Sequence, residues 1–168
     1  MRTFGGRHSV DKSAPADAQL YEYTGGRPHN RCRKQHIQYG TAWRYRFLYA
    51  HWYIGGHSLG GSMAASYASA HSSQLSGVIM LAAYPSKSLN ENTRAVIIYG
   101  SEDGVLNMAK LEEANRYLLN DTKTCVIEGG NHAQFGNYGR QDGDGIADIS
   151  SEEQQLRTME LILQSICN

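Results

Sequence analysis

The chain has 168 residues, and its 16 Lys and Arg balance 16 Asp and Glu, so its formal net charge is zero. That length suits one domain with a single core. It contains no apolar run long enough to cross a membrane, which excludes a membrane-spanning class. Because the first ten residues also lack the apolar segment of a signal peptide, we expect a cytoplasmic protein.

Although the net charge is zero, the two parts of the chain carry opposite charges. Residues 1–50 carry nine basic and three acidic residues, a charge of +6, and the remainder therefore carries −6. We expect an irregular basic leader over residues 1–50 and a folded unit over residues 51–168. Cys32, Cys125 and Cys167 are far apart and odd in number, which favours three free thiols over a metal site or a disulfide framework.

The leader shows no sustained periodicity before about residue 36. Gly-Gly pairs and prolines interrupt it, so we expect loop or disorder there. Residues 43–49 alternate aromatic and other side chains, which fits a strand or a short helix. Basic residues beside aromatics also occur in nucleic-acid binders, but these belong to no recognition motif, and we expect no nucleic-acid partner.

From His51 onward, strands and helices are expected in alternation. The predicted strands are 51–54, 78–83, 94–99 and 124–127, and the predicted helices are 59–71, 108–119 and one that Ser150 or Ser151 caps. The most regular apolar stripe of that last helix is Leu156, Met159, Leu163 and Ile166, and Leu161 and Ile162 add to its apolar side. This alternation predicts an α/β fold, a parallel sheet flanked by helices on both faces.

The strongest local motif lies between the first of these strands and its helix. Gly56, Ser58 and Gly60 fit the G-x-S-x-G pattern of a nucleophile elbow, in which a sharp turn exposes the serine hydroxyl. Glycines are needed on either side because a side chain there would collide with the neighbouring strand or helix. Ser58 is therefore the candidate nucleophile.

A serine hydroxyl needs a base to accept its proton and an acid to orient that base. In hydrolases with this elbow the acid and then the base follow the nucleophile along the chain. Asp103 follows the strand at 94–99, with adjacent Glu102 as the alternative acid, and His132 follows the strand at 124–127. We assign Asp103 as the orienting acid and His132 as the general base.

Other polar residues near these positions receive weaker interpretations. His57 is expected to pack beside the elbow, whereas His51 and Trp52 belong to an edge or the core. Asp142, Asp144 and Asp148 resemble a calcium loop faintly, but no glutamate closes it, so a solvated loop that positions His132 is favoured. The residues expected to line or brace the site are Asn131, Phe135, Asn137 and Tyr138.

Taken together, these motifs resemble the α/β-hydrolase superfamily, and within it the small bacterial dienelactone-hydrolase-like branch. The matching stretches are GGHSLGG at 55–61, LAAYP at 81–85, YGSEDGV at 99–105, GGNHAQFGNYG at 129–139, QDGDG at 141–145 and SSEEQQ at 150–155. The resemblance implies a serine hydrolase of carboxylic esters with neither metal nor organic cofactor. It also implies that the N–H of Leu59 serves the oxyanion hole.

The resemblance does not reach residues 1–50. We therefore expect the C-terminal portion of a hydrolase behind a non-homologous leader. No second oxyanion donor is identified, and the elbow strand would be an open edge through which the protein could self-associate. The alternative function is a catalytically inactive hydrolase-like fragment that acts only as a binding module. Only residues 84–93 separate two strands where a cap is often inserted, which predicts an open site for small or exposed esters.

Overall fold

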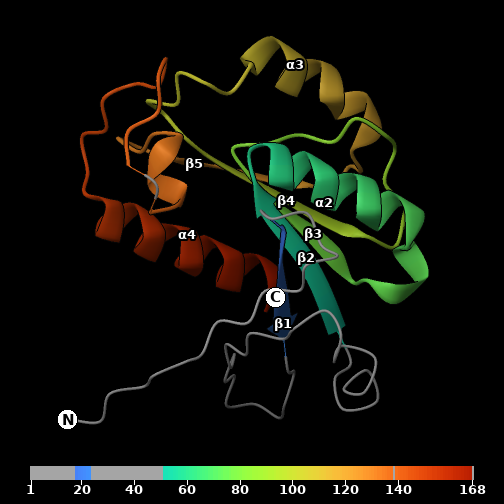
Figure 1. Ribbon diagram of the computed structural model, residues 1–168. Helices are drawn as coiled ribbons and strands as arrows, with labels where there is room; N and C mark the ends of the chain where they lie inside the picture. The colour runs from blue at the N-terminus through green and yellow to red at the C-terminus, as the bar shows by residue number, and fades with distance from the viewer. Residues whose placement is uncertain (1–17, 24–50, 138, 168) are drawn as a thin grey trace, which may run out of the picture.

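The computed structural model describes residues 18–23, 51–137 and 139–167. One five-stranded sheet organises them, in the order β1-β2-β3-β4-β5 (Figure 1). Strands β2 (His51–His57), β3 (Gly77–Leu81), β4 (Arg94–Gly100) and β5 (Lys123–Ile127) run parallel, as the sequence predicts. The α/β class is thereby confirmed.

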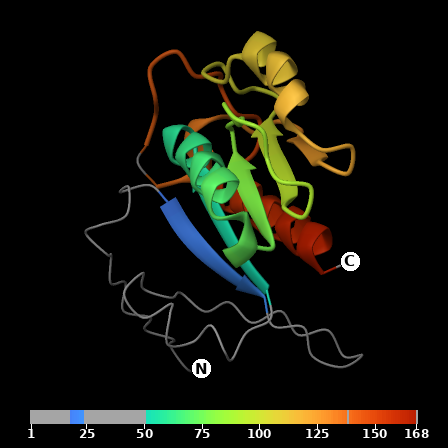
Figure 2. The same cartoon turned by 90° about the vertical axis from the view of Figure 1, so that its right-hand side faces the viewer.

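Helices cover both faces of this sheet (Figures 1 and 2). Helix α2 (Leu59–Ala70) follows β2, α3 (Met108–Glu113) follows β4, and α4 (Ser151–Ile166) closes the described chain. Short 3-10 turns are η2 (Ser72–Gln74), η3 (Ala114–Tyr117) and η4 (Ala133–Phe135). Helix α4 lies on the face opposite α2, so the sheet is the middle of three layers.

Successive side chains of each strand point to opposite faces of the sheet, so the core consists of two clusters, one on each face. Val78 and Met80 of β3 join the cluster under α2 and α3, whereas Ile79 and Leu81 join the cluster under α4. Because successive strand side chains point to opposite faces, a strand covered on both sides is apolar throughout. All five residues of β3 are buried, as that arrangement requires.

Strand β1 (Ala18–Tyr23) corrects two predictions. It lies inside the stretch expected to be loop or disorder, and it pairs antiparallel with β2, from Ala18 opposite Gly56 to Tyr23 opposite His51. The elbow strand is therefore not an open edge. Self-association stays a prediction, and in the described sheet the outer strands are β1 and β5. The possible element at 43–49 lies outside the described residues.

Two further expectations need correction. The apolar stripe expected on α4 is confirmed only in part: Ile162 and Ile166 are buried, but Leu156 is 51% exposed. The other buried residues of α4 are the polar Gln154, Thr158 and Ser165. Ser150 caps the helix as expected, since its side chain accepts a hydrogen bond from the N–H of Glu153. Free thiols were expected at all three cysteines, but Cys167 is disulfide-bonded, while Cys125 is free.

Within the described part of the chain, no helix has both the length and the apolar character needed to cross a bilayer.

Candidate active site

Ser58 occupies the sharp turn between β2 and α2. Its backbone has φ 53° and ψ −123°, a region that residues with a side chain rarely adopt. The N–H of Ser58 donates to the carbonyl of Leu81 across the sheet at 2.9 Å, which fixes the turn to β3. Although Ser58 is the N-cap residue of α2, its side chain makes no capping hydrogen bond. The hydroxyl is thus not used in holding the helix.

The glycines around Ser58 allow strand and helix to approach closely. A Cβ on Gly56 would collide with the backbone of Gly60, and one on Gly61 would lie 2.6 Å from the Cβ of Ala83. Real Cβ atoms essentially never come so close to another heavy atom. Close packing of strand and helix therefore requires glycine at position 56 of the motif, and at Gly61 just after it.

Asp103 follows β4, and a set of donors holds its carboxylate. Oδ1 accepts hydrogen bonds from the N–H groups of Val105 at 3.0 Å and Leu106 at 2.7 Å. Burial raises the pKa of Asp103, but the hydrogen bonds from His132, Leu106 and Val105 and the charge of His132 outweigh it. The net pKa lies below its ordinary value of 3.8. Asp103 is thus held in its ionised form.

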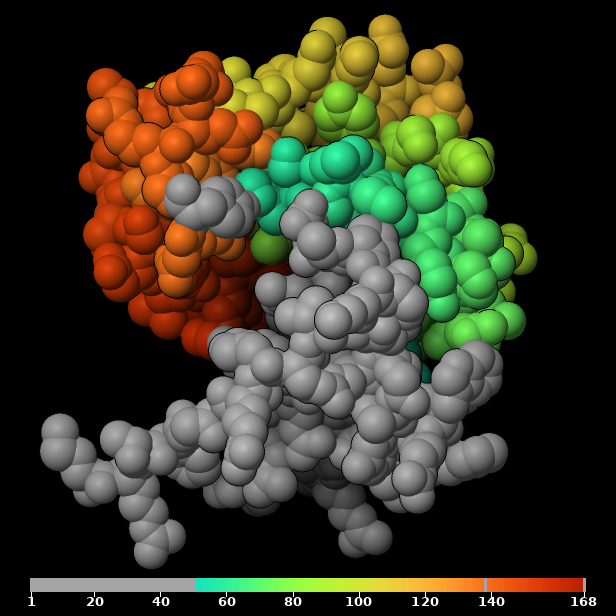
Figure 3. Space-filling view, viewed as in Figure 1, coloured from blue at the N-terminus to red at the C-terminus, as the bar shows by residue number. Residues whose placement is uncertain are grey.

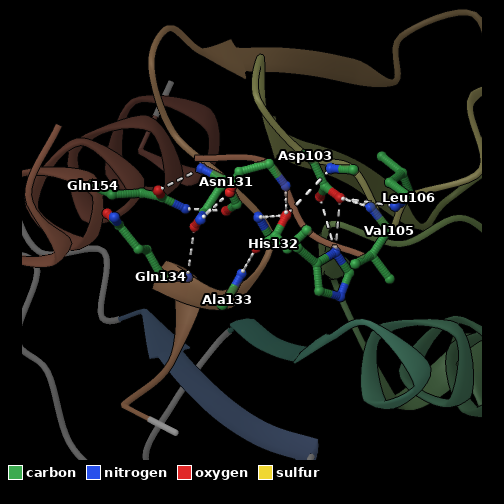
Figure 4. Close-up of polar contacts among 11 residues, drawn as sticks. Asp103, Val105, Leu106, Asn131, His132, Ala133, Gln134 and Gln154 are labelled. Carbon is green, nitrogen blue, oxygen red and sulfur yellow. Dashed lines mark hydrogen bonds and ion pairs between the residues drawn. The ribbon is translucent and has the colours of Figure 1, made fainter. Parts of the chain in front are cut away.

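His132 follows β5 and is 1% exposed. Its Nδ1 lies 2.9 Å from Oδ2 and 3.0 Å from Oδ1 of Asp103, and the side chains of both residues are 1% exposed. Since an ionised carboxylate only accepts, Nδ1 carries the proton and donates it. Figure 4 shows the imidazole between the Asp103 carboxylate and the ribbon of β2 and α2.

The other nitrogen of His132, Nε2, is buried and has no hydrogen-bond partner among the described residues. A neutral imidazole with a protonated Nδ1 presents Nε2 as an acceptor, the form that a general base requires. The Ser58 hydroxyl does not reach Nε2 in this structure. Catalytic hydrogen bonds are often long in free enzymes and tighten when substrate binds.

The elbow and the base nevertheless lie side by side. The ring of His57, the residue before Ser58, has its centroid 4.5 Å from that of His132 and 5.7 Å from that of Phe135. His57 therefore packs beside the elbow, as expected, and against the base as well. In the space-filling view the orange surface of the loop after β5 adjoins the teal surface of the elbow helix (Figure 3).

Glu102, the alternative acid, has a different neighbour. Its carboxylate accepts a hydrogen bond from the Ser101 hydroxyl at 3.0 Å, and the residue is exposed. Asp103 and not Glu102 is therefore the acid that contacts His132. The candidate oxyanion donor, Leu59, is the first residue of α2 and is 68% exposed. N–H groups in a first helical turn have no partner within the helix.

Comparison with known families agrees with this architecture. A family model described as "Alpha/beta hydrolase family" matches residues 45–156, two thirds of the chain. The chain belongs to the alpha/beta hydrolase family. The comparisons with curated proteins and with solved structures found no match. The dienelactone-hydrolase-like branch therefore stays a prediction from the motifs alone.

Other residues of this alpha/beta hydrolase occupy the places expected of them. Trp52 is 8% exposed and in the core, whereas His51 is exposed at the start of β2, where Nδ1 lies 3.1 Å from the Ser76 hydroxyl. Asn131 braces the loop after β5, because its side chain donates to the carbonyl of Gly145 and accepts from the N–H of Gln134. Tyr138 lies outside the described residues.

Two residues that position the site were not identified individually from the sequence. Gln154 of α4 is fully buried and pairs with the backbone of Asn131: Oε1 accepts from its N–H at 2.9 Å, and Nε2 donates to its carbonyl at 2.7 Å. Asp144 accepts from the N–H groups of His132 and Ala133 (Figure 4 draws the donors). A polar residue on the apolar side of α4 was the available signal for Gln154.

Asp142, Asp144 and Asp148, which resemble a calcium loop in sequence, do not form a metal-binding group. In the part of the chain that the structure describes, no group of three or more His, Cys, Asp or Glu side chains is arranged to hold a metal ion. The Asp144 carboxylate is directed at backbone N–H groups instead.

Proposed function

We propose that this protein hydrolyses carboxylic esters through an acyl-enzyme intermediate on Ser58. The observation that carries the proposal is the buried pair of His132 and Asp103 beside the turn that bears Ser58. Family membership supports hydrolysis in general, and the ester substrate and the triad are our inference. The expected partner is a small ester molecule, with no organic cofactor or metal and no nucleic acid. The expected cytoplasmic location also stays a prediction.

Each residue has a defined role in the proposed reaction. The Ser58 hydroxyl attacks the ester carbonyl carbon while Nε2 of His132 accepts its proton, and the Leu59 N–H stabilises the oxyanion. The imidazolium then protonates the leaving alkoxide, so the alcohol departs and Ser58 is acylated. Water, deprotonated by the same Nε2, releases the carboxylic acid and restores Ser58. Asp103 holds the imidazole in the required tautomer and stabilises its charged form.

Labelling with a fluorophosphonate probe tests this proposal directly. The probe reacts with activated serines, and mass spectrometry locates the adduct on the native protein. We expect labelling at Ser58 that is lost on heat denaturation and in Ser58→Ala. The control is Ser66→Ala, which makes the same chemical change on α2, the helix that Ser58 precedes, and should keep the label. Because denatured protein presents the same serines without the site, it measures nonspecific reaction.

A folded, soluble protein that fails to label at Ser58 would contradict the proposal. Labelling that survives Ser58→Ala would contradict it as well, since another serine would then carry the reactivity. The first of these results would favour the alternative of a hydrolase-like module that acts only by binding.

A further inference from the structure

The acid and the base of the candidate site stand on different loops. Asp103 lies in the turn after β4, and His132 lies in the turn after β5. The distance between them therefore depends on how these two turns are joined. One direct link is the hydrogen bond from the Glu102 N–H to the Gly130 carbonyl at 2.8 Å. A third segment, the 141–145 loop, lies against both turns.

One carboxylate in the 141–145 loop binds both turns at once. Oδ1 of Asp144 accepts hydrogen bonds from the N–H groups of Gly104 at 3.2 Å, His132 at 3.1 Å and Gly145 at 2.9 Å. Its Oδ2 accepts from the N–H of Ala133 at 2.8 Å. The N–H donors from the two turns thus belong to the residue after Asp103, to the base itself and to the residue after the base.

Glycines at 104 and 145 make this contact possible. A Cβ on Gly104 would lie 2.5 Å from the carbonyl oxygen of Gly143, and a Cβ on Gly145 would collide with the carbonyl oxygen of Glu102. The 141–145 loop and the acid turn therefore touch backbone to backbone, with no room for a side chain between them. Glycine at 104 and 145 thus lets the carboxylate of Asp144 reach both turns, while Gly143 has φ +82°, a conformation that favours glycine.

We propose that Asp144 is a positioning residue that holds the acid turn and the base turn at the separation where Nδ1 of His132 meets the Asp103 carboxylate. Its effect on catalysis rests on the proposed function, but its effect on the His132–Asp103 hydrogen bond does not. An ionised carboxylate has enough lone pairs to accept all four hydrogen bonds, and bonds to a charged acceptor are stronger than neutral ones. Without it, four backbone N–H groups lose their acceptor.

The test compares three variants in two measurements. Asp144→Ala removes every acceptor, and Asp144→Asn keeps one carbonyl oxygen but directs an amide NH2 at one of the former donors. Asp142→Ala is the matched control, because Asp142 is exposed on the same loop and also loses a charge. The first measurement is the low-field proton resonance of His132 Nδ1–H, assigned by its loss in His132→Gln. The second is kcat and KM on a short-chain ester.

We expect Asp144→Ala to shift or broaden the Nδ1–H resonance and to lower kcat on the order of 100-fold, as small displacements of reacting groups do. KM should change little, because substrate contacts are not removed. Asp144→Asn should give intermediate values, and Asp142→Ala should match the wild type. If Asp144→Ala does not fold, the Asn variant decides, since it keeps one acceptor oxygen.

Several outcomes would overturn the proposal. An Asp144 variant that is less stable but keeps the resonance and kcat would show a structural role only. If Asp142→Ala changes the resonance and kcat as much as Asp144→Ala does, the cause is the lost negative charge and not the lost hydrogen bonds. A wild type without the resonance would lack the hydrogen bond that Asp144 is proposed to maintain. A wild type with the resonance but without esterase activity would contradict the proposed function alone, and the resonance would still test Asp144.

Discussion

Asp103 binds two kinds of donor, the imidazole of His132 and the backbone N–H groups of Val105 and Leu106. The imidazole link serves the proposed chemistry, and the backbone links fix the turn that presents the carboxylate. Sequence reasoning identified Asp103 from its place after a strand and before Gly104. It did not identify the two backbone donors, because they depend on the conformation of the turn.

The lowered pKa of Asp103 predicts a specific dependence of stability on pH. A group whose pKa is lower in the folded state contributes stability above its unfolded value, and loses it as pH falls through the folded value. The free energy of unfolding of the wild type should therefore fall more steeply below about pH 4 than that of Asp103→Asn. Urea unfolding at a series of pH values measures both slopes.

Glu102→Gln is the control for this experiment, because it removes a neighbouring exposed carboxylate that does not contact His132. Its free energy of unfolding should fall below about pH 4 as steeply as that of the wild type. Parallel curves for the wild type and Asp103→Asn would contradict the assignment of this pH dependence to Asp103.

Among the elements, the close approach of α2 to the sheet depends on glycines. A Cβ on Gly61 would meet the Cβ of Ala83 at 2.6 Å and the carbonyl oxygen of Gly56 at 2.7 Å. Gly61→Ala should therefore destabilise the fold by about 1–3 kcal/mol, the usual cost of overpacking. Denaturant unfolding of the variant against the wild type measures this cost.

Ala83→Gly removes one of the two atoms in that collision. The double variant should recover part of the loss, and a double-mutant cycle measures the coupling between the two positions. Additive effects of the two substitutions would show that contact with Ala83 is not the cause of the loss.

Helix α4 shows where an apolar pattern misleads. The pattern favours Leu156, yet the helix buries Gln154 and Thr158 and leaves Leu156 half exposed. Gln154 is buried because its amide pairs with the backbone of Asn131, so it joins α4 to the turn that carries His132. A requirement set by another segment of the chain cannot be derived from the periodicity of the helix itself.

Gln154→Ala should be destabilising for that reason. It leaves the N–H and the carbonyl of Asn131 without their partner, and each unpaired buried polar group costs about 1–3 kcal/mol. Gln155→Ala is the matched control, because Gln155 is the next residue and is only partly buried. Denaturant unfolding should separate the two variants, and equal losses would contradict the role assigned to Gln154.

At the scale of the whole molecule, the parallel sheet and its helices could be predicted because each strand from β2 to β5 has its own apolar run and its own turn signals. Strand β1 could not, since its six residues pair antiparallel with a distant strand, and no local pattern specifies that partner. The candidate site shows the same difference between local patterns and contacts that join distant segments. Order along the chain gave Ser58, Asp103 and His132, whereas Asp144 is recognised only from hydrogen bonds between loops.

If the proposed ester hydrolysis is correct, the residues around the elbow also predict which acyl lengths are preferred. Residues 82–93 join β3 to β4 without a helix or strand, so no cap is built from this connection. Leu59, the residue after Ser58, and Met63, one turn further along α2, are 68% and 42% exposed. For the proposed ester hydrolysis, we expect these two side chains to contact a short acyl chain and a longer chain to extend beyond them into water.

We therefore expect kcat/KM for p-nitrophenyl esters to be highest for acetate to butyrate and to fall towards palmitate. Leu59→Ser and Met63→Ser should lower kcat/KM for butyrate more than for acetate, because only butyrate loses apolar contact. Each buried CH2 contributes about 0.8 kcal/mol, so full loss of contact by one methylene would cost about fourfold. A rate that rises steadily to palmitate would contradict an open site and would require a covered acyl channel.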